Sequence, residues 1–301
     1  MPNIRARRST AKWFLRILAH VAVVWLALFL MFQWFEGKIT YHPPRHLIET
    51  PSGRGVAFED VFMETEDGLA AHGWWIPAPA IDADDSEERA APPTILEFHG
   101  NAENISYGMD QHVAFHGLGW NQLVVDYRGY GRSEGEPSEE GLYRDGDAAY
   151  AHVRARGVPP ERIVIYGRSL GGAVAVYVAH RHPAAALVTE GLFTDTHRVG
   201  RDILPFIPVR LFIKKRFDSL SRVSGLHVPK LFMHAAYDEV IPVHHAERVF
   251  EAAAPPKELF WIPGAGHNDA FYAATKAYLA AVKRFVETHV QKISEERISP
   301  I

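Results

Sequence analysis

Short apolar segments alternate with helical patterns through most of this chain, and this alternation constrains the fold more than any other feature. Apolar runs of about five residues are typical of strands that are buried on both faces. Strands separated by helices favour a mostly parallel sheet, because parallel neighbours need a crossover connection. The sequence therefore predicts an α/β fold. The expected strands are 56–65, 69–77, 94–99, 122–126, 162–166, 185–189, 230–234 and 259–262, and the expected helices are 103–117, 138–156, 170–182, 243–253 and 269–290.

An apolar segment near the start of the chain stands outside this pattern. Ile17–Phe35 contains no Asp, Glu, Lys or Arg, and Arg5, Arg7, Arg8, Lys12 and Arg16 precede it. As a helix rising about 1.5 Å per residue, it would span roughly 28 Å, close to the hydrocarbon thickness of a bilayer. We interpret it as an uncleaved single-pass membrane anchor. The positive-inside rule then predicts a cytosolic N-terminus and a main domain on the periplasmic or other extracytosolic side.

Two other interpretations of this segment remain open. A cleaved signal peptide has a shorter apolar core and small residues at its cleavage site, whereas Met-Phe-Gln-Trp-Phe-Glu-Gly follows Leu30. A core helix of a soluble domain would carry polar residues along one face, and this segment has almost none.

Composition excludes several classes of function. A net charge of -4 argues against nucleic acid as a main partner. The absence of Cys excludes disulfides, thiolate metal sites, iron–sulfur clusters and cysteine nucleophiles. We divide the chain into a basic leader and anchor (1–36), a connector (37–55), one globular domain (56–291) and a C-terminal tail (292–301). Residues 193–227 interrupt the alternation, and they predict either a small cap or a surface excursion.

The nucleophile candidate lies in Gly167-Arg168-Ser169-Leu170-Gly171, which matches the pattern G-x-S-x-G. It follows a predicted strand and precedes a predicted helix, the context that this motif needs, because the serine occupies a sharp turn where bulky neighbours clash. The following helix directs its N-terminal amides toward developing negative charge. Ser169 is therefore the predicted nucleophile, and a structural serine turn is the alternative.

A serine hydroxyl needs a base, and the base needs a group that orients it. Asp238 and His267 each follow a predicted strand, and with Ser169 they give the chain order serine, acid, histidine. Because the ends of parallel strands meet at one edge of a sheet, we expect the three side chains to lie together. Competing acids are Glu190, Asp195 and Glu239.

An oxyanion hole needs two backbone N–H donors. We expect one from Leu170, directly after the nucleophile. The other is expected from the loop after the strand 94–99, where Asn101 is the favoured donor and Ala102 the alternative. His99 in the same loop is interpreted as a structural tether.

These motifs together resemble the serine hydrolases of the α/β-hydrolase superfamily. The chain is most similar to membrane-anchored members with a small cap and an N-terminal transmembrane segment. The resemblance implies an eight-stranded, mostly parallel sheet flanked by helices, and hydrolysis through an acyl-enzyme without a cofactor. It rests on His99-Gly100-Asn101-Ala102, the block from Asp126 to Ser133, the block from Gly167 to Gly172, the Asp238 and His267 loops, and Tyr41-His42-Pro43-Pro44.

The expected function is hydrolysis of carboxylic esters or thioesters, on acyl or lipid-like substrates near the membrane. A peptidase or amidase on the same fold, or a non-catalytic binding protein, are the alternatives, since fold alone does not select a substrate.

No metal site is expected, because the pairs His112/His116 and His244/His245 are interpreted as surface histidines. Asn104-Ile105-Ser106 matches a glycosylation sequon, and the sequence identifies no protein partner.

Overall fold

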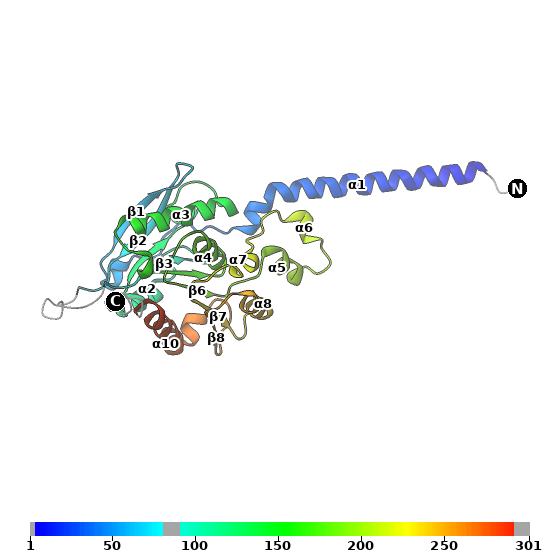
Figure 1. The fold of residues 1–301 in the computed structure, drawn as a ribbon. Helices are drawn as coiled ribbons and strands as arrows, with labels where there is room; N and C mark the ends of the chain where they lie inside the picture. Colours follow the sequence, from blue (N-terminus) through cyan, green and yellow to red (C-terminus); the bar gives the residue numbers. More distant parts are fainter. Residues whose placement is uncertain (1–3, 81–90, 292–301) are drawn as a thin grey trace.

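The computed structural model describes residues 4–80 and 91–291, so the predicted tail 292–301 lies outside the described residues. Its sheet has eight strands in the order β1-β2-β4-β3-β5-β6-β7-β8 (Figure 1). The first two strands form an antiparallel hairpin, β2 is antiparallel to β4, and every other pairing is parallel. The predicted mostly parallel sheet is therefore confirmed. The strands are β1 (Glu59–Glu64), β2 (Ala70–Ile76), β3 (Thr94–Phe98), β4 (Asn121–Val125), β5 (Ile163–Arg168), β6 (Ala186–Glu190), β7 (Lys230–Ala235) and β8 (Lys257–Ile262).

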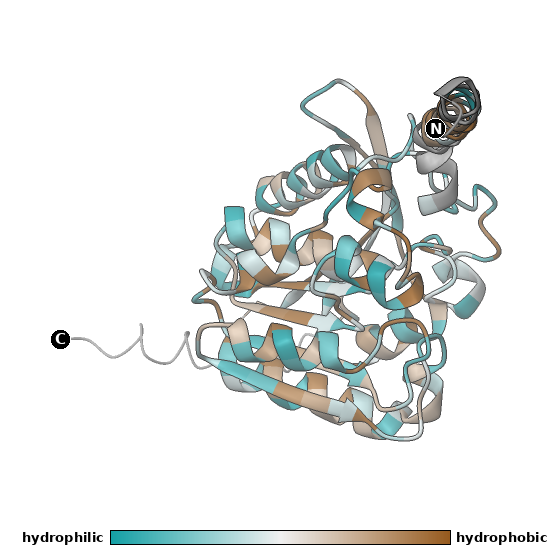
Figure 2. Cartoon of the chain, turned by 90° about the vertical axis from the view of Figure 1, so that its right-hand side faces the viewer, coloured by the Kyte–Doolittle hydropathy of each residue, from teal (hydrophilic) through white to brown (hydrophobic). Residues whose placement is uncertain are grey.

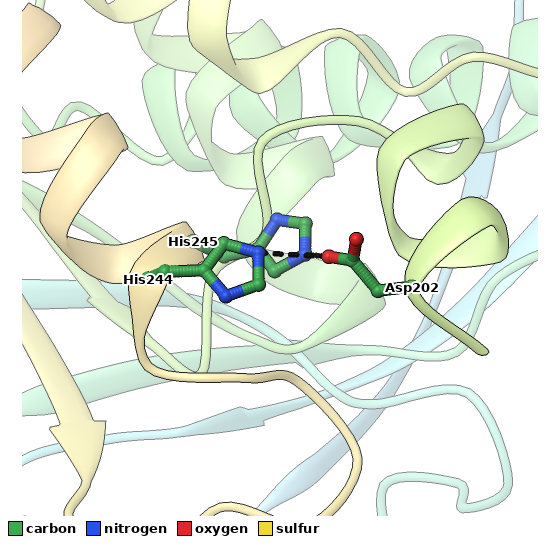
Figure 3. Close-up of side chains that lie close together, drawn as sticks. All are labelled: Asp202, His244 and His245. Carbon is green, nitrogen blue, oxygen red and sulfur yellow. Dashed lines mark hydrogen bonds and ion pairs between the residues drawn. The ribbon is translucent and has the colours of Figure 1, made fainter. Parts of the chain in front are cut away.

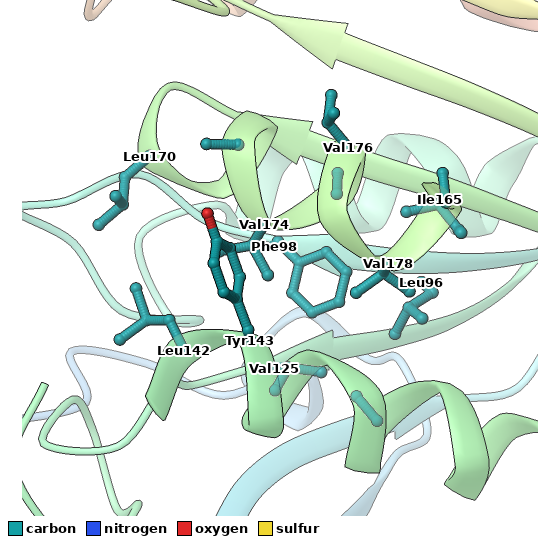
Figure 4. Close-up of a cluster of buried hydrophobic side chains, with 14 of the residues drawn as sticks. Leu96, Phe98, Val125, Leu142, Tyr143, Ile165, Leu170, Val174, Val176 and Val178 are labelled. Carbon is teal, nitrogen blue, oxygen red and sulfur yellow. The ribbon is translucent and has the colours of Figure 1, made fainter. Parts of the chain in front are cut away.

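Helices cover both faces of this sheet. Alternate residues of β3 point to opposite faces, so Leu96 and Phe98 join one hydrophobic core while Ile95 joins the other. The first core receives α3 (Glu139–Ala155), α4 (Leu170–Arg181) and α8 (His244–Ala252), and Figure 4 shows its centre. The second core receives α2 (Met109–Gly117) and α10 (Thr275–Val286). The short apolar strands are thus buried on both faces, as their composition predicts.

Two predicted helices differ from the observed ones. The helix expected at 103–117 begins only at Met109, because the Asn104 side chain accepts hydrogen bonds from the amide and hydroxyl of Ser106 and holds a turn there. The helix expected at 269–290 is divided into α9 (Ala270–Ala273) and α10, followed by a π-helical turn at Glu287–Gln291. Ala274 separates the two helices with φ of -139°, outside the helical range.

The N-terminal helix α1 runs from Ile4 to Thr40, so it continues into the segment predicted as a connector. Its stretch Lys12–Met31 has a mean hydropathy of 2.2, and none of it is buried against the domain. The interpretation as a core helix is therefore wrong. By length and composition α1 is a candidate membrane anchor. It projects away from the domain in Figure 1, and Figure 2 views it nearly end-on.

Residues 193–227, called the insertion from here on, join β6 to β7 through three short helices. These are α5 (Thr196–Ile203), α6 (Val209–Phe212) and α7 (Ser219–Val223). Asp195, one of the competing acids, is the N-cap of α5 and accepts a hydrogen bond from the Arg198 amide at 2.9 Å. Its carboxylate is thus committed to a helix start.

A carboxylate–histidine cluster fastens the insertion to the main domain. Asp202 Oδ2 in α5 lies 2.7 Å from His244 Nε2 and 2.9 Å from His245 Nε2 at the start of α8 (Figure 3). His245 is fully buried, and its Nδ1 lies 2.8 Å from the Thr194 hydroxyl. The interpretation of His245 as a surface residue is therefore wrong.

Candidate active site

Ser169 occupies the turn between β5 and α4 with φ of 51°, a left-handed conformation that is strained for a residue with a side chain. Its amide donates to the Glu190 carbonyl at 2.8 Å. The flanking glycines are required by close packing. A Cβ atom on Gly167 would lie 2.2 Å from the Gly171 carbonyl oxygen, and one on Gly171 would lie 2.1 Å from the Phe98 carbonyl oxygen. The G-x-S-x-G spacing thus brings the serine to the carboxyl ends of β3 and β5.

The structure brings Ser169, His267 and Asp238 together as a continuous hydrogen-bonded chain. His267 Nε2 lies 3.1 Å from Ser169 Oγ, and His267 Nδ1 lies 2.8 Å from Asp238 Oδ2. Asp238 follows β7, and its Oδ1 accepts from the Val240 and Ile241 amides at 3.0 and 2.6 Å. Both carboxylate oxygens are therefore committed, so the carboxylate and the imidazole ring that it holds are fixed in orientation.

The environment of Asp238 favours its ionised form. Burial raises the pKa of this carboxyl, but the hydrogen bond and charge of His267 and the Ile241 amide lower it more, so the pKa lies below its usual range. His234 lies beneath the pair, with its Nε2 2.9 Å from the Ile241 carbonyl and 3.5 Å from Asp238 Oδ2. A buried, ionised carboxylate beside an imidazole is the arrangement that stabilises an imidazolium ion.

The loop after β3 lies opposite the serine. The Asn101 side chain fixes this loop, because its amide donates to the Thr40 carbonyl and its oxygen accepts from the Tyr130 hydroxyl, each at 2.7 Å. The Gly100 amide is occupied by Glu103 Oε1 at 2.5 Å. Leu170 begins α4, where amides have no partner within the helix. Asn101, Ala102 and Leu170 all line the same cavity as Ser169.

The other competing acids are engaged elsewhere. Glu190 Oε2 accepts from the hydroxyls of Tyr166 and Tyr278, at 2.9 and 2.5 Å, in a buried network below the site. Glu239 accepts from the backbone amide of His267 at 3.0 Å, so its carboxylate supports the backbone of the histidine loop. Of the four candidate acids, Asp238 is the one whose carboxylate is hydrogen-bonded to the imidazole of His267.

Arg168 is a site residue that sequence reasoning missed. Its guanidinium donates to Glu103 Oε1 at 2.7 Å, to Glu190 Oε1 at 3.3 Å and to the His267 carbonyl at 3.0 Å. Burial lowers the pKa of Arg168, but the carboxylates of Glu103 and Glu190 raise it by more than burial lowers it. The pKa therefore lies above its usual range, and the guanidinium stays charged. It therefore joins the loop after β3, the end of β6 and the histidine loop. The sequence feature that could have indicated this role is the position of Arg168 directly before Ser169 in the G-x-S-x-G motif.

A second carboxylate–histidine cluster lies at the end of β4. Asp126 is fully buried, with Oδ2 3.4 Å from His72 Nδ1 and Oδ1 3.4 Å from His99 Nε2. Burial raises the pKa of Asp126, but hydrogen bonds from both histidines lower it more, so it lies below its usual range. Asp126 Oδ1 also accepts from the Ile105 amide at 3.0 Å. This cluster fixes the loop after β3, in keeping with the predicted tether role of His99.

One prediction about that loop region is wrong, and the sequon there is buried. His112 is buried, with Nε2 2.9 Å from the Ile105 carbonyl, so it is not a surface histidine. Asn104 of the sequon is also buried, and its side-chain amide donates to the carbonyls of Pro44 and His46 at 3.2 and 2.8 Å. A glycan cannot be attached to this amide in the folded protein.

A cavity of about 800 Å³ opens over Ser169 and His267. Such a volume suits a small organic substrate or part of a longer chain. The insertion and the base of α1 both contribute to its lining, through Phe193, Thr196, Phe217 and Thr40. The insertion therefore takes part in forming the site.

The chain is similar in sequence to several known proteins. Residues 90–218 match the family described as "Serine aminopeptidase, S33". The chain is 36% identical over 275 residues to the uncharacterized protein Rv2307c of Mycobacterium tuberculosis, covering 90% of this chain and 95% of that protein. It is also 36% identical to the α/β-hydrolase domain-containing protein 17B of Xenopus laevis, over 65% of this chain and 67% of that protein.

A solved structure shows the same fold. The esterase Pf2001 of Pyrococcus furiosus superposes with a TM-score of 0.67 at 20% sequence identity, over 83% of this chain and 99% of the esterase chain. Together with the sheet order, the serine turn and the curated relatives, this assigns the chain to a family. The protein belongs to the α/β-hydrolase superfamily of serine hydrolases.

Proposed function

We propose that this hydrolase cleaves carboxylic esters or thioesters, with Ser169 as nucleophile, His267 as base and Asp238 as the orienting acid. The observation that carries the proposal is the chain of hydrogen bonds from Asp238 Oδ2 through His267 to Ser169 Oγ, at 2.8 and 3.1 Å, on the wall of the cavity. No cofactor is needed for this chemistry.

The proposed reaction has two halves. His267 Nε2 takes the hydroxyl proton of Ser169 as Oγ attacks the carbonyl carbon, and Asp238 stabilises the resulting imidazolium. Amides of Leu170 and Asn101 bind the oxyanion, with Ala102 as the alternative to Asn101. His267 then protonates the leaving alcohol or thiol, which departs and leaves an acyl-enzyme. Water, deprotonated by His267, attacks the acyl carbon. The bond to Ser169 Oγ then breaks, His267 returns the proton to that oxygen, and the acid is released.

The proposed substrates are acyl or lipid-like molecules at a membrane. Two observations support this: α1 is apolar and long enough to cross a bilayer, and the cavity reaches Thr40 at its C-terminal end. We propose that α1 is an uncleaved anchor with a cytosolic N-terminus, which places the catalytic domain on the periplasmic or other extracytosolic side.

The direct test is labelling of the full-length protein with a fluorophosphonate probe, with Ser169→Ala as the matched control. We expect labelling of the native chain and none of the variant. Folded native protein that remains unlabelled would contradict the proposal and favour a non-catalytic binding protein. Matched esters and thioesters of short and long acyl chains then define the leaving group and the acyl length.

A peptidase or amidase activity is the second candidate. It is favoured by one observation, the match of residues 90–218 to a family described as serine aminopeptidases. The same nucleophile and base cleave an amide when His267 protonates the leaving amine. Faster turnover of aminoacyl amides than of the corresponding esters would replace the first candidate with the second.

A further inference from the structure

The insertion presents a run of exposed apolar residues. The last residue of α5 and its connection to α6 form the run Ile203-Leu204-Pro205-Phe206-Ile207-Pro208, here called the apolar tip, and all six residues are exposed. Phe206 is 97% exposed and Ile203 61%. Folded domains rarely expose several consecutive apolar residues unless the segment binds something. We therefore expect the apolar tip to bind an apolar surface.

The apolar tip is held in a defined shape. The Leu204 amide donates to the Gly200 carbonyl at 2.8 Å, and the Val209 amide donates to the Ile207 carbonyl at 2.8 Å. Val209 is buried and packs against Gly200, where a Cβ atom would lie 2.7 Å from Val209 Cγ1. At its base, Asp202 is bound to His244 and His245 of α8. The structure thus presents these side chains to solvent from a fastened support.

The position of the apolar tip relative to α1 indicates which surface the tip binds. The insertion touches α1 through the rings of Phe212 and Phe29, whose centroids are 5.9 Å apart. In Figure 1 the connection between α5 and α6 is the part of the domain that reaches furthest in the direction in which α1 extends. A bilayer crossed by α1 would meet this part of the domain first.

Charge at the edges of the apolar tip fits the same surface. Arg201 precedes it and Arg210 follows it, and both residues are exposed. An apolar wedge flanked by cations matches an interface in which acyl chains lie below anionic phosphate groups. A protein partner would have to approach between the domain and the membrane, where the apolar tip points.

We propose that the apolar tip inserts into the lipid surface beside α1, as a second membrane contact of the catalytic domain. This inference rests on the proposed anchor role of α1. Because Thr40 at the base of α1 and Phe193, Thr196 and Phe217 of the insertion line the cavity, insertion of the tip holds the cavity close to the lipid. A substrate held in the bilayer then has a short path to Ser169.

The absence of Cys in the native chain permits a direct test. Phe206→Cys in the full-length protein is labelled with an environment-sensitive fluorophore and reconstituted into vesicles of phosphatidylcholine and phosphatidylglycerol. Phe62→Cys is the matched control, because Phe62 is a 52% exposed phenylalanine on β1. We expect a blue-shifted emission and quenching by spin-labelled lipid at position 206, and water-like, unquenched emission at position 62.

The outcomes separate the inference from the anchor proposal. If the chain is removed from vesicles by carbonate, the anchor proposal fails and the inference fails with it. If the chain stays in the vesicles but position 206 is quenched no more than position 62, lipid insertion alone is overturned, and a protein partner becomes the occupant of the apolar tip.

A kinetic test uses Phe206→Asp, a residue outside the site. We expect about a tenfold loss of activity toward an ester dispersed in the vesicles, which corresponds to about 1.4 kcal/mol. Activity toward a short water-soluble ester should be unchanged, which also shows that the variant is folded. Equal activity of the variant and native chain toward the vesicle ester would contradict a role of the apolar tip in substrate access.

Discussion

Asp238 and Asp126 are buried carboxylates that each lie against histidines, yet only the Asp238 pair is placed for catalysis. Asp238 holds His267, whose second ring nitrogen lies 3.1 Å from the hydroxyl of Ser169. Asp126 lies 3.4 Å from His72 and from His99, whose remaining nitrogens lie 2.7 Å from Asp60 Oδ1 and from the Gly100 carbonyl. Those partners are a carboxylate and a backbone carbonyl, so neither offers a hydroxyl proton that the imidazole could remove as a base. An acid–imidazole pair therefore becomes reactive only through its third partner.

The largest expected effect is on the catalytic side of this comparison. Asp238→Asn should lower kcat toward an ester about 10⁴-fold, because a neutral amide holds the wrong tautomer and does not stabilise the imidazolium. Steady-state kinetics of the detergent-solubilised full chain measures this. A loss below tenfold would show that Asp238 is not the orienting acid, and Glu239→Gln is the control for the neighbouring carboxylate.

The matched substitution in the other cluster should have the opposite profile. Asp126→Asn should reduce the free energy of unfolding by about 1–3 kcal/mol, because it replaces a buried carboxylate that lies 3.4 Å from two histidines and accepts from the Ile105 amide. Its kcat should fall by no more than about tenfold, because Asp126 touches no reacting atom and acts only through the loop after β3. Denaturant unfolding and kinetics on one preparation check both values. If Asp126→Asn lowered kcat and left the free energy of unfolding unchanged, the Asp126 cluster would be catalytic like the Asp238 pair, and the comparison would fail.

Arg168 should show an intermediate effect, because it links the two regions through Glu103, Glu190 and the His267 carbonyl. Arg168→Met should lower kcat about 10²-fold through misplacement of the histidine and oxyanion loops, with a smaller change in KM. Arg168→Lys should recover part of the loss, because one ammonium group cannot reach every acceptor. Equal rates for Arg168→Met and the native enzyme would limit Arg168 to a structural role.

The smallest effect concerns pH. The pKa values of Asp126 and Asp238 both lie below their usual range in the folded protein. A lowered carboxyl pKa adds stability that is fully present above the unfolded value of about 3.9 and is lost as pH falls through the folded value. The stability difference between native protein and Asp126→Asn should therefore be constant from neutral pH to about pH 5 and shrink at lower pH. A difference that grows on acidification would contradict these directions.

Sequence alone determined the α/β fold, because the apolar strands and the helical spacing are local patterns. The sheet confirms the alternation, including the hairpin at 56–77. Chain order also predicted that Ser169, Asp238 and His267 would meet at one edge, since each follows a strand of a parallel sheet. Their hydrogen-bond distances fit that expectation, and their catalytic roles are our proposal.

Tertiary structure decided which polar residues are buried and what they bind. His112 and His245 were expected at the surface, and Asn104 lies in a sequon, yet all three residues are buried. His245 and Asn104 bind segments that are distant in the chain. The role of Arg168 depends on three loops that no local pattern brings together. The exposure of the apolar tip likewise depends on where α5 and α6 rest. Periodicity along the chain records which face of an element is apolar, whereas burial and hydrogen-bond partners arise only when distant segments pack together.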